Sequence, residues 1–62
     1  MLLPRVERFL RVTGMPWTKF GRLAASDPRL VADMRNGRVP RPSLEQKVEH
    51  FMNTYLETSN AR

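Results

Sequence analysis

A short segment in the middle of the chain, Ser26-Asp27-Pro28, separates two stretches of amphipathic sequence. Asp27 can accept a hydrogen bond from an unpaired N–H group at a helix start, and Pro28 suits the first helical position because no N–H is needed there. Further on, Asn36-Gly37 supplies residue types that tolerate the left-handed conformation at a helix C-terminus. The sequence therefore predicts a helix over residues 28–36, about two and a half turns long.

The stretch before this turn, starting near Pro16 or Thr18, also has helical periodicity. Its predicted apolar side comprises Phe20, Leu23 and Ala24. Gly21 is unusual there, since glycine inside a helix costs about 0.5–1 kcal/mol relative to alanine. We therefore expect the following helix to approach closely at Gly21; the alternative is that this glycine is merely tolerated. The inward-facing residues predicted for the following helix are Leu30, Val31 and Met34.

One further helix is predicted on each side of this pair. The first covers roughly residues 3–13, is closed by Gly14, and is followed by the connector Met15-Pro16. Its apolar face comprises Val6, Phe9, Leu10 and Thr13. Residues 38–42 form a basic extended loop, because two prolines exclude a helix there. The last helix opens with a capping box at residues 43–46, in which Ser43 and Gln46 satisfy each other's backbone N–H groups. Its apolar stripe comprises Leu44, Val48, Phe51 or Met52, and Tyr55.

No segment alternates apolar and polar residues as a strand would, so we predict an all-α fold, a compact bundle of four helices with five as the alternative. A chain of 62 residues forms one domain, predicted over residues 1–57 with a flexible polar tail at 58–62. With no cysteine and one histidine, we expect no metal site and no cofactor. No apolar run suggests a membrane span or signal peptide, so the expected location is the cytoplasm, in association with the nucleoid.

Charge is divided unevenly along the chain, whose formal net charge is +5. Between residues 17 and 41, six basic residues outnumber two acidic ones, whereas residues 43–57 contain three glutamates and one lysine. This division predicts a domain with a positive side that attracts an anionic partner such as nucleic acid. The alternative is an ordinary mixed and solvated surface.

The two central helices and their turn are typical of a helix-turn-helix, and the order of elements resembles the phage repressor and Cro-like family, also called the XRE family. The resemblance covers roughly residues 6–56. It rests on Phe20-Gly21, on Val31 and Met34, and on Arg35-Asn-Gly-Arg38 before the helix start Pro42-Ser-Leu44. The chain departs from the family in having Gly21 where alanine is usual and Ala25 where glycine is common. The resemblance implies a lambda-repressor-like bundle and a bacterial or phage transcriptional regulator that binds double-stranded DNA.

In such a protein, residues 28–36 would lie in the DNA major groove and read base edges. The predicted base-reading residues are Arg29, Ala32 and Asp33. Arg29 can donate two hydrogen bonds to guanine, Ala32 can touch a thymine methyl group, and Asp33 can accept from cytosine or, preferably, orient Arg29 through an i, i+4 pair. The predicted phosphate contacts are Thr18, Lys19, Arg22, Arg35, Asn36, Arg38 and Arg41. About four charged contacts would give a log–log salt slope near −3.6.

An enzyme is not expected, because His50 has no nucleophile or ligand beside it and a domain this small leaves little room for a cleft. Trp17 is assigned to a partly buried core, with stacking on DNA as the alternative. The main alternative function is a protein-interaction module that docks its acidic last helix on a regulatory or transcription-machinery partner. Exposure of Met52, Tyr55 and His50 would favour that function.

A membrane-active cationic peptide fits the charge alone, and five prolines and defined helix caps argue against it. Many members of the resembled family dimerise through a fifth helix. Nothing after Leu56 is long or apolar enough to supply one, so a homodimer and a separate partner protein are both kept as alternatives.

Overall fold

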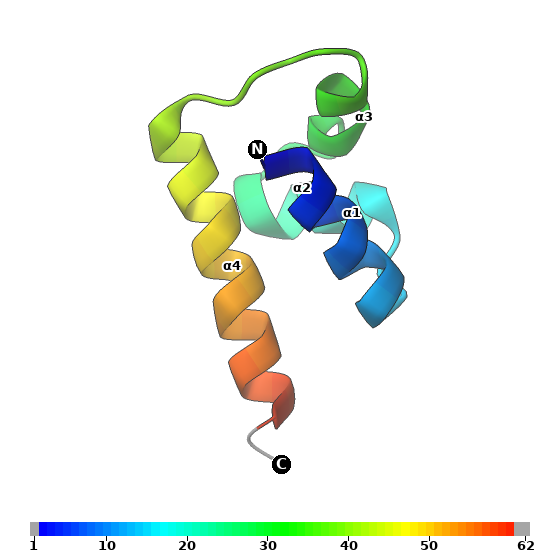
Figure 1. The fold of residues 1–62 in the computed structure, drawn as a ribbon, viewed down its shortest axis with the longest axis vertical. Coiled ribbons are helices and arrows are strands. Elements are labelled where there is room, and N and C mark those ends of the chain that lie inside the picture. Colours follow the sequence, from blue (N-terminus) through cyan, green and yellow to red (C-terminus); the bar gives the residue numbers. More distant parts are fainter. Residues whose placement is uncertain (1, 61–62) are drawn as a thin grey trace.

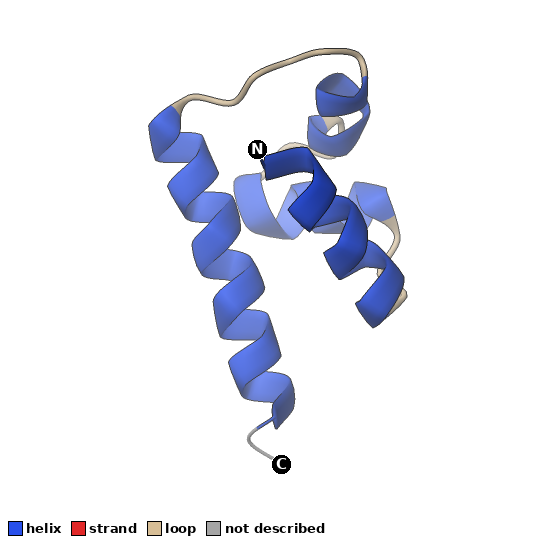
Figure 2. Cartoon of the chain, viewed as in Figure 1, coloured by secondary structure: helices blue, strands red, loops and turns tan. Residues whose placement is uncertain are grey.

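Four helices make up most of residues 2–60, the part of the chain that a computed structural model describes, with side chains described for residues 2–57. They are α1 (Leu2–Thr13), α2 (Trp17–Ala25), α3 (Leu30–Arg35) and α4 (Pro42–Asn60). Figure 1 shows α4 as a long rod on one side, with the other three helices grouped beside it. No strand and no fifth helix occurs in the described residues (Figure 2), so the predicted all-α, four-helix fold is confirmed.

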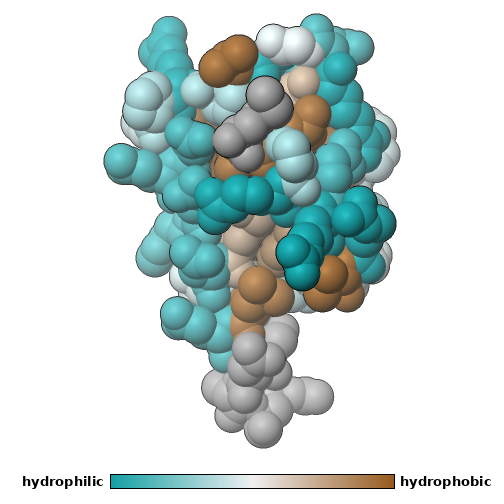
Figure 3. Space-filling model, viewed as in Figure 1, coloured by the Kyte–Doolittle hydropathy of each residue, from teal (hydrophilic) through white to brown (hydrophobic). Residues whose placement is uncertain are grey.

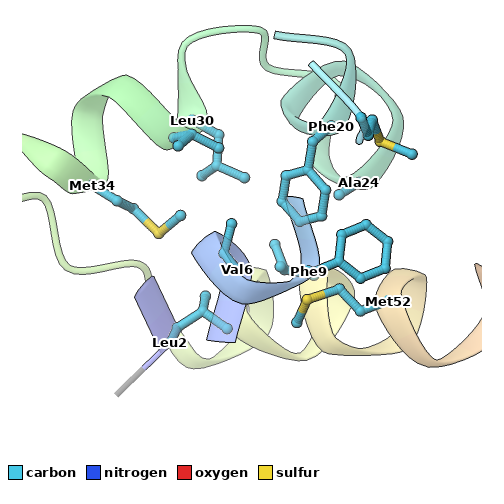
Figure 4. Close-up of a cluster of buried hydrophobic side chains, with 11 residues drawn as sticks. Leu2, Val6, Phe9, Phe20, Ala24, Leu30, Met34 and Met52 are labelled. Atoms are coloured by element: carbon cyan, nitrogen blue, oxygen red, sulfur yellow. The ribbon is translucent and has the colours of Figure 1, made fainter. Parts of the chain in front are cut away.

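The hydrophobic core lies where α1, α2 and α3 meet α4 (Figure 4). Its buried apolar residues are Leu2, Val6, Phe9, Met15, Phe20, Ala24, Leu30, Val31, Met34, Val48 and Met52. Aromatic rings cluster around Phe9, whose ring centroid lies 5.4 Å from that of Phe20 and 5.5 Å from that of Tyr55. The inward face predicted for α3 is confirmed, because Leu30, Val31 and Met34 are all buried.

The predicted helix over residues 28–36 is wrong at its start, because α3 begins at Leu30 and has six residues. Pro28 and Arg29 belong to the turn instead. The Asp27 carbonyl accepts a hydrogen bond from the Leu30 N–H at 3.1 Å, and Arg29 has φ −97° and ψ 5°. Both features are those of a type I turn with proline at its second position. α3 is therefore only about one and a half turns long.

α4 begins one residue before the predicted capping box. Pro42 is its first residue, and the Glu45 N–H donates to the Arg41 carbonyl at 2.8 Å, so Arg41 occupies the cap position. Ser43 therefore lies inside the first turn, and the predicted capping box at residues 43–46 is wrong. The physical reason is that proline fits the first helical position, where its missing N–H needs no partner.

The other helix ends agree with the glycine signals. Gly14 follows α1 with φ +71°, and Gly37 follows α3 with φ +103°, both in the left-handed region. α4 continues through Asn60, beyond the predicted domain boundary at residue 57. Residues 61–62 of the predicted tail lie outside the described residues.

Leu23, predicted to face the core, lies at the surface and is 52% exposed. Trp17, predicted to be partly buried, is 39% exposed. The buried line of α2 runs through Phe20 and Ala24, one turn apart, and Leu23 falls beside this line rather than on it. Of the three residues whose exposure would favour a protein-interaction module, Met52 lies in the core, whereas Tyr55 and His50 are exposed.

Candidate nucleic-acid interface

α2 ends in a left-handed turn at Ser26, which has φ 56° and is the one described residue other than glycine with a positive φ. The Ser26 N–H donates to the Arg22 carbonyl, and the Asp27 N–H donates to the Gly21 carbonyl, each at 3.0 Å. The two bonds span four and six residues, each one residue wider than in a Schellman motif, and they pair carbonyl groups near the end of α2 while the chain reverses. The turn of the predicted helix-turn-helix is thus held by backbone hydrogen bonds.

At Gly21 the turn that follows α2 approaches this helix closely. A Cβ atom at this position would collide with the carbonyl oxygen of Asp27 and would lie 3.2 Å from the Cβ atom of Leu30. The close approach predicted at this glycine is confirmed, and the main contact is with the turn that precedes α3. The absence of a side chain lets this turn and the first residue of α3 lie directly on α2.

A cluster of two aspartates and one arginine links the two ends of α3. The predicted helix-capping role of Asp27 is wrong, because α3 has Arg29 at its N-cap and no side-chain cap hydrogen bond. Asp27 caps the turn instead, where its Oδ1 accepts the Arg29 N–H at 3.0 Å. Its Oδ2 lies 3.2 Å from Arg38 Nη1, which lies 3.3 Å from Asp33 Oδ2. The Arg29 N–H, and then the Arg38 guanidinium, hold the pKa of the Asp27 carboxyl below its usual range. Arg38, predicted to contact phosphate, therefore joins the turn before α3 to the loop after it.

The three predicted base-reading residues differ in their surroundings. Arg29 is exposed, and it makes no ion pair within residues 2–57. Ala32 and Asp33 are half-buried. The expected pair between Arg29 and Asp33 is wrong, because Arg38 takes the Asp33 carboxylate. Only Arg29 therefore offers an exposed side chain with uncommitted hydrogen-bond donors.

Arg35, also predicted to contact phosphate, is bound to α1. Its Nε and Nη2 atoms donate to the two carboxylate oxygens of Glu7 at 2.7 and 2.8 Å. Its guanidinium carbon lies 6.0 Å from the centre of the Trp17 ring, within range of a cation–π contact. The hydrogen bond from Arg35 lowers the pKa of Glu7. No sequence pattern signalled this bridge, because its two partners are 28 residues apart.

The remaining predicted phosphate contacts are exposed on the elements that flank α3. They are the cations Lys19, Arg22 and Arg41 and the polar residues Thr18 and Asn36. None of the three cations forms an ion pair with a described side chain. Lys19 and Arg22 lie about one turn apart in α2, and Arg41 precedes α4. These side chains add positive charge on either side of Arg29 in the sequence.

Residues 2–60 also bear on two other features, a metal site and a membrane span. Within that range no group of three histidine, aspartate or glutamate side chains is placed to hold a metal ion, and no helix has the length and apolar character to cross a membrane. His50 is exposed, with Nε2 3.5 Å from the Thr54 hydroxyl oxygen.

The chain matches no family model, no curated protein and no solved structure.

Proposed function

We propose that this chain binds double-stranded DNA in a sequence-specific manner, as a small bacterial or phage transcriptional regulator with a lambda-repressor-like arrangement of helices. The observation that carries the proposal is the exposed Arg29, which has no ion-pair partner among the described residues and immediately precedes α3. In a helix-turn-helix, side chains near the start of the second helix reach base edges in the major groove. In this proposal α2, the turn that follows Ser26 and α3 are the helix-turn-helix.

The chemistry of Arg29 suits guanine. Its planar guanidinium can donate two parallel hydrogen bonds to O6 and N7, a contact worth about 1–3 kcal/mol of discrimination. Because α3 is short, base contacts concentrate at its beginning, and Ala32 adds an apolar contact to a thymine methyl group. We assign no base contact to Asp33, because Arg38 already occupies its carboxylate.

Electrostatic affinity for DNA is expected from the cations that form no ion pair with another described side chain of the chain. Asp27 and Asp33 would repel phosphate, but the Arg38 guanidinium lies against both carboxylates and offsets part of their charge. The phosphate contacts then fall to Lys19, Arg22 and Arg41, with Thr18 and Asn36 as neutral donors. Three charged contacts give a log–log salt slope of about −2.7, and recruitment of a fourth cation gives about −3.6.

The test is selection of bound sequences from a randomised duplex library at near-physiological salt. The wild-type chain should enrich a motif containing guanine, and Arg29→Ala should lose the preference at one position of that motif. Lys47→Ala is the matched control, since it removes an exposed cation of α4 and should leave the motif unchanged. Failure of the folded wild-type chain to enrich any sequence would refute the proposal.

A further inference from the structure

A groove of about 390 Å³ runs between α1 and α4. Phe9 and Met52, both buried, form its floor. Figure 3 shows hydrophobic surface in the lower half of the view, where α4 and the end of α1 lie, bordered by hydrophilic side chains. No residue of α2 or α3 lines this groove, so it is separate from the candidate nucleic-acid interface.

The rims of the groove carry apolar side chains that are exposed to solvent in the single chain. Val12 on the α1 rim is 69% exposed, and Leu56 on the α4 rim is 40% exposed. Two arginines accompany them on the α1 side: Arg5 pairs with Glu49 at 2.7 Å, whereas Arg8 makes no ion pair within the described residues. Apolar surface bordered by uncompensated positive charge is the mark of a docking surface for an acidic, amphipathic partner.

We propose that the occupant of this groove is a second copy of the chain, docked so that α1 of each copy lies over α4 of the other. The chain itself provides the acidic helix that the groove requires. α1 carries three arginines and one glutamate, whereas residues 43–57 carry three glutamates and one lysine. Glu57 does not line the groove, but it is exposed, follows the lining residue Leu56 and lies about one turn after Asn53, so it is the acidic side chain next to the groove on this part of α4. Arg8 of one copy then pairs with Glu57 of the other, and Val12 packs on Leu56.

Symmetry selects this arrangement. A two-fold dimer uses the same surface on both copies, so every contact occurs twice. An axis across the groove would lay α1 over α1 and bring Arg8 against its own symmetry copy. An axis along the groove lays α1 over α4 and joins opposite charges. It also leaves α2 and α3 outside the interface, so this dimer does not depend on the proposed DNA binding.

The area available sets the expected strength of this association. A stable interface buries about 800 Å² on each partner. The whole chain has an accessible surface of 4550 Å², of which the groove and its rims are a small part. We therefore expect a reversible equilibrium between monomer and dimer, visible at high concentration, rather than a permanent dimer.

Sedimentation equilibrium of the full chain without DNA, from micromolar to millimolar concentration, tests the proposal. The wild-type chain should dimerise, and Arg8→Glu and Glu57→Arg should each weaken the dimer by about tenfold or more, because each places like charges together twice. The combined variant R8E/E57R should restore dimerisation, since the pair is reversed. Lys47→Glu, on α4 and outside the groove, should leave the equilibrium unchanged.

Circular dichroism melts show that each variant is folded. A wild-type chain that stays monomeric throughout overturns the proposal, and so does a dimer that responds equally to Lys47→Glu and Arg8→Glu. A combined variant that is folded but fails to dimerise also overturns it. Binding of a different protein at Val12 and Leu56 by a monomeric chain would assign the groove to another occupant. Should Arg8→Glu unfold the chain, Leu56→Asp tests the same contact.

Discussion

Replacing Gly21 with alanine tests whether the turn lies on α2 as closely as the structure indicates. The added Cβ atom would collide with the carbonyl oxygen of Asp27. This oxygen is part of a backbone held on both sides, because the Asp27 N–H donates to the Gly21 carbonyl and the Asp27 carbonyl accepts from Leu30. No change of rotamer relieves a collision with backbone, so the whole turn must move away from α2.

The expected effect is the difference between two opposing contributions. Alanine in a helix interior stabilises by about 0.5–1 kcal/mol relative to glycine. Overpacking of a close contact costs about 1–3 kcal/mol, and weakening the hydrogen bond from Asp27 to Gly21 costs about 0.5–1.5 kcal/mol more. The steric contribution is larger, and Gly21→Ala should lower the free energy of unfolding by about 1–3 kcal/mol.

Urea unfolding followed by the helical circular dichroism signal measures this change. With a slope of about 1 kcal/mol per molar for a domain this small, the midpoint should fall by about 1–3 M. Thr18→Ala is the control, because this exposed residue of the same helix should change stability by less than about 0.5 kcal/mol. A Gly21→Ala chain that is as stable as the wild type, or more stable, would refute the close contact between the turn and α2.

Further perturbations test the turn, the faces of α3 and the carboxylates. Ser26→Gly should stabilise the chain by about 1 kcal/mol, because glycine adopts the left-handed conformation without steric cost, and should raise the melting temperature by about 4–8 °C. Val31→Ala should destabilise by about 1–3 kcal/mol in urea unfolding, whereas Arg29→Ala should leave stability unchanged; equal losses would contradict the assigned faces. The pKa values of Asp27 and Glu7 are lowered by folding, so the stability they contribute is present at neutral pH and is lost as the pH falls through the lowered pKa values. Urea midpoints measured from about pH 6 down to about pH 3 should fall, and less so in Asp27→Asn.

Local sequence signals predicted most of the helices and turns, because the backbone conformations that they favour depend on only a few neighbouring residues. Gly14 and Gly37 mark chain reversals that require positive φ, and both were placed correctly. Gly21 was informative for a different reason: an unfavourable residue in a helix is expected where a neighbour leaves no room for a side chain. The error at Pro28 has a local cause too, because proline suits both the first helical position and the second position of a type I turn.

The partners of the arginines could not be predicted in the same way. Arg35 meets Glu7 only after α1 and α3 have packed together, and Arg38 reaches Asp27 only because the chain reverses at Gly37. A list of basic residues between 17 and 41 therefore predicted the sign of the surface potential. It could not distinguish cations paired with a carboxylate of the same chain, such as Arg35, from those without such a partner among the described residues.

The contacts around α3 restrict how its recognition properties can change by mutation. Leu30, Val31 and Met34 are committed to the core, and Arg35 is committed to Glu7. Asp33, together with Asp27 and Arg38, holds the ends of the helix. The described side chains left open to exchange are chiefly those of Arg29, Ala32 and Asn36. Libraries aimed at a new binding preference should therefore vary these three positions and keep the rest of residues 27–38 constant.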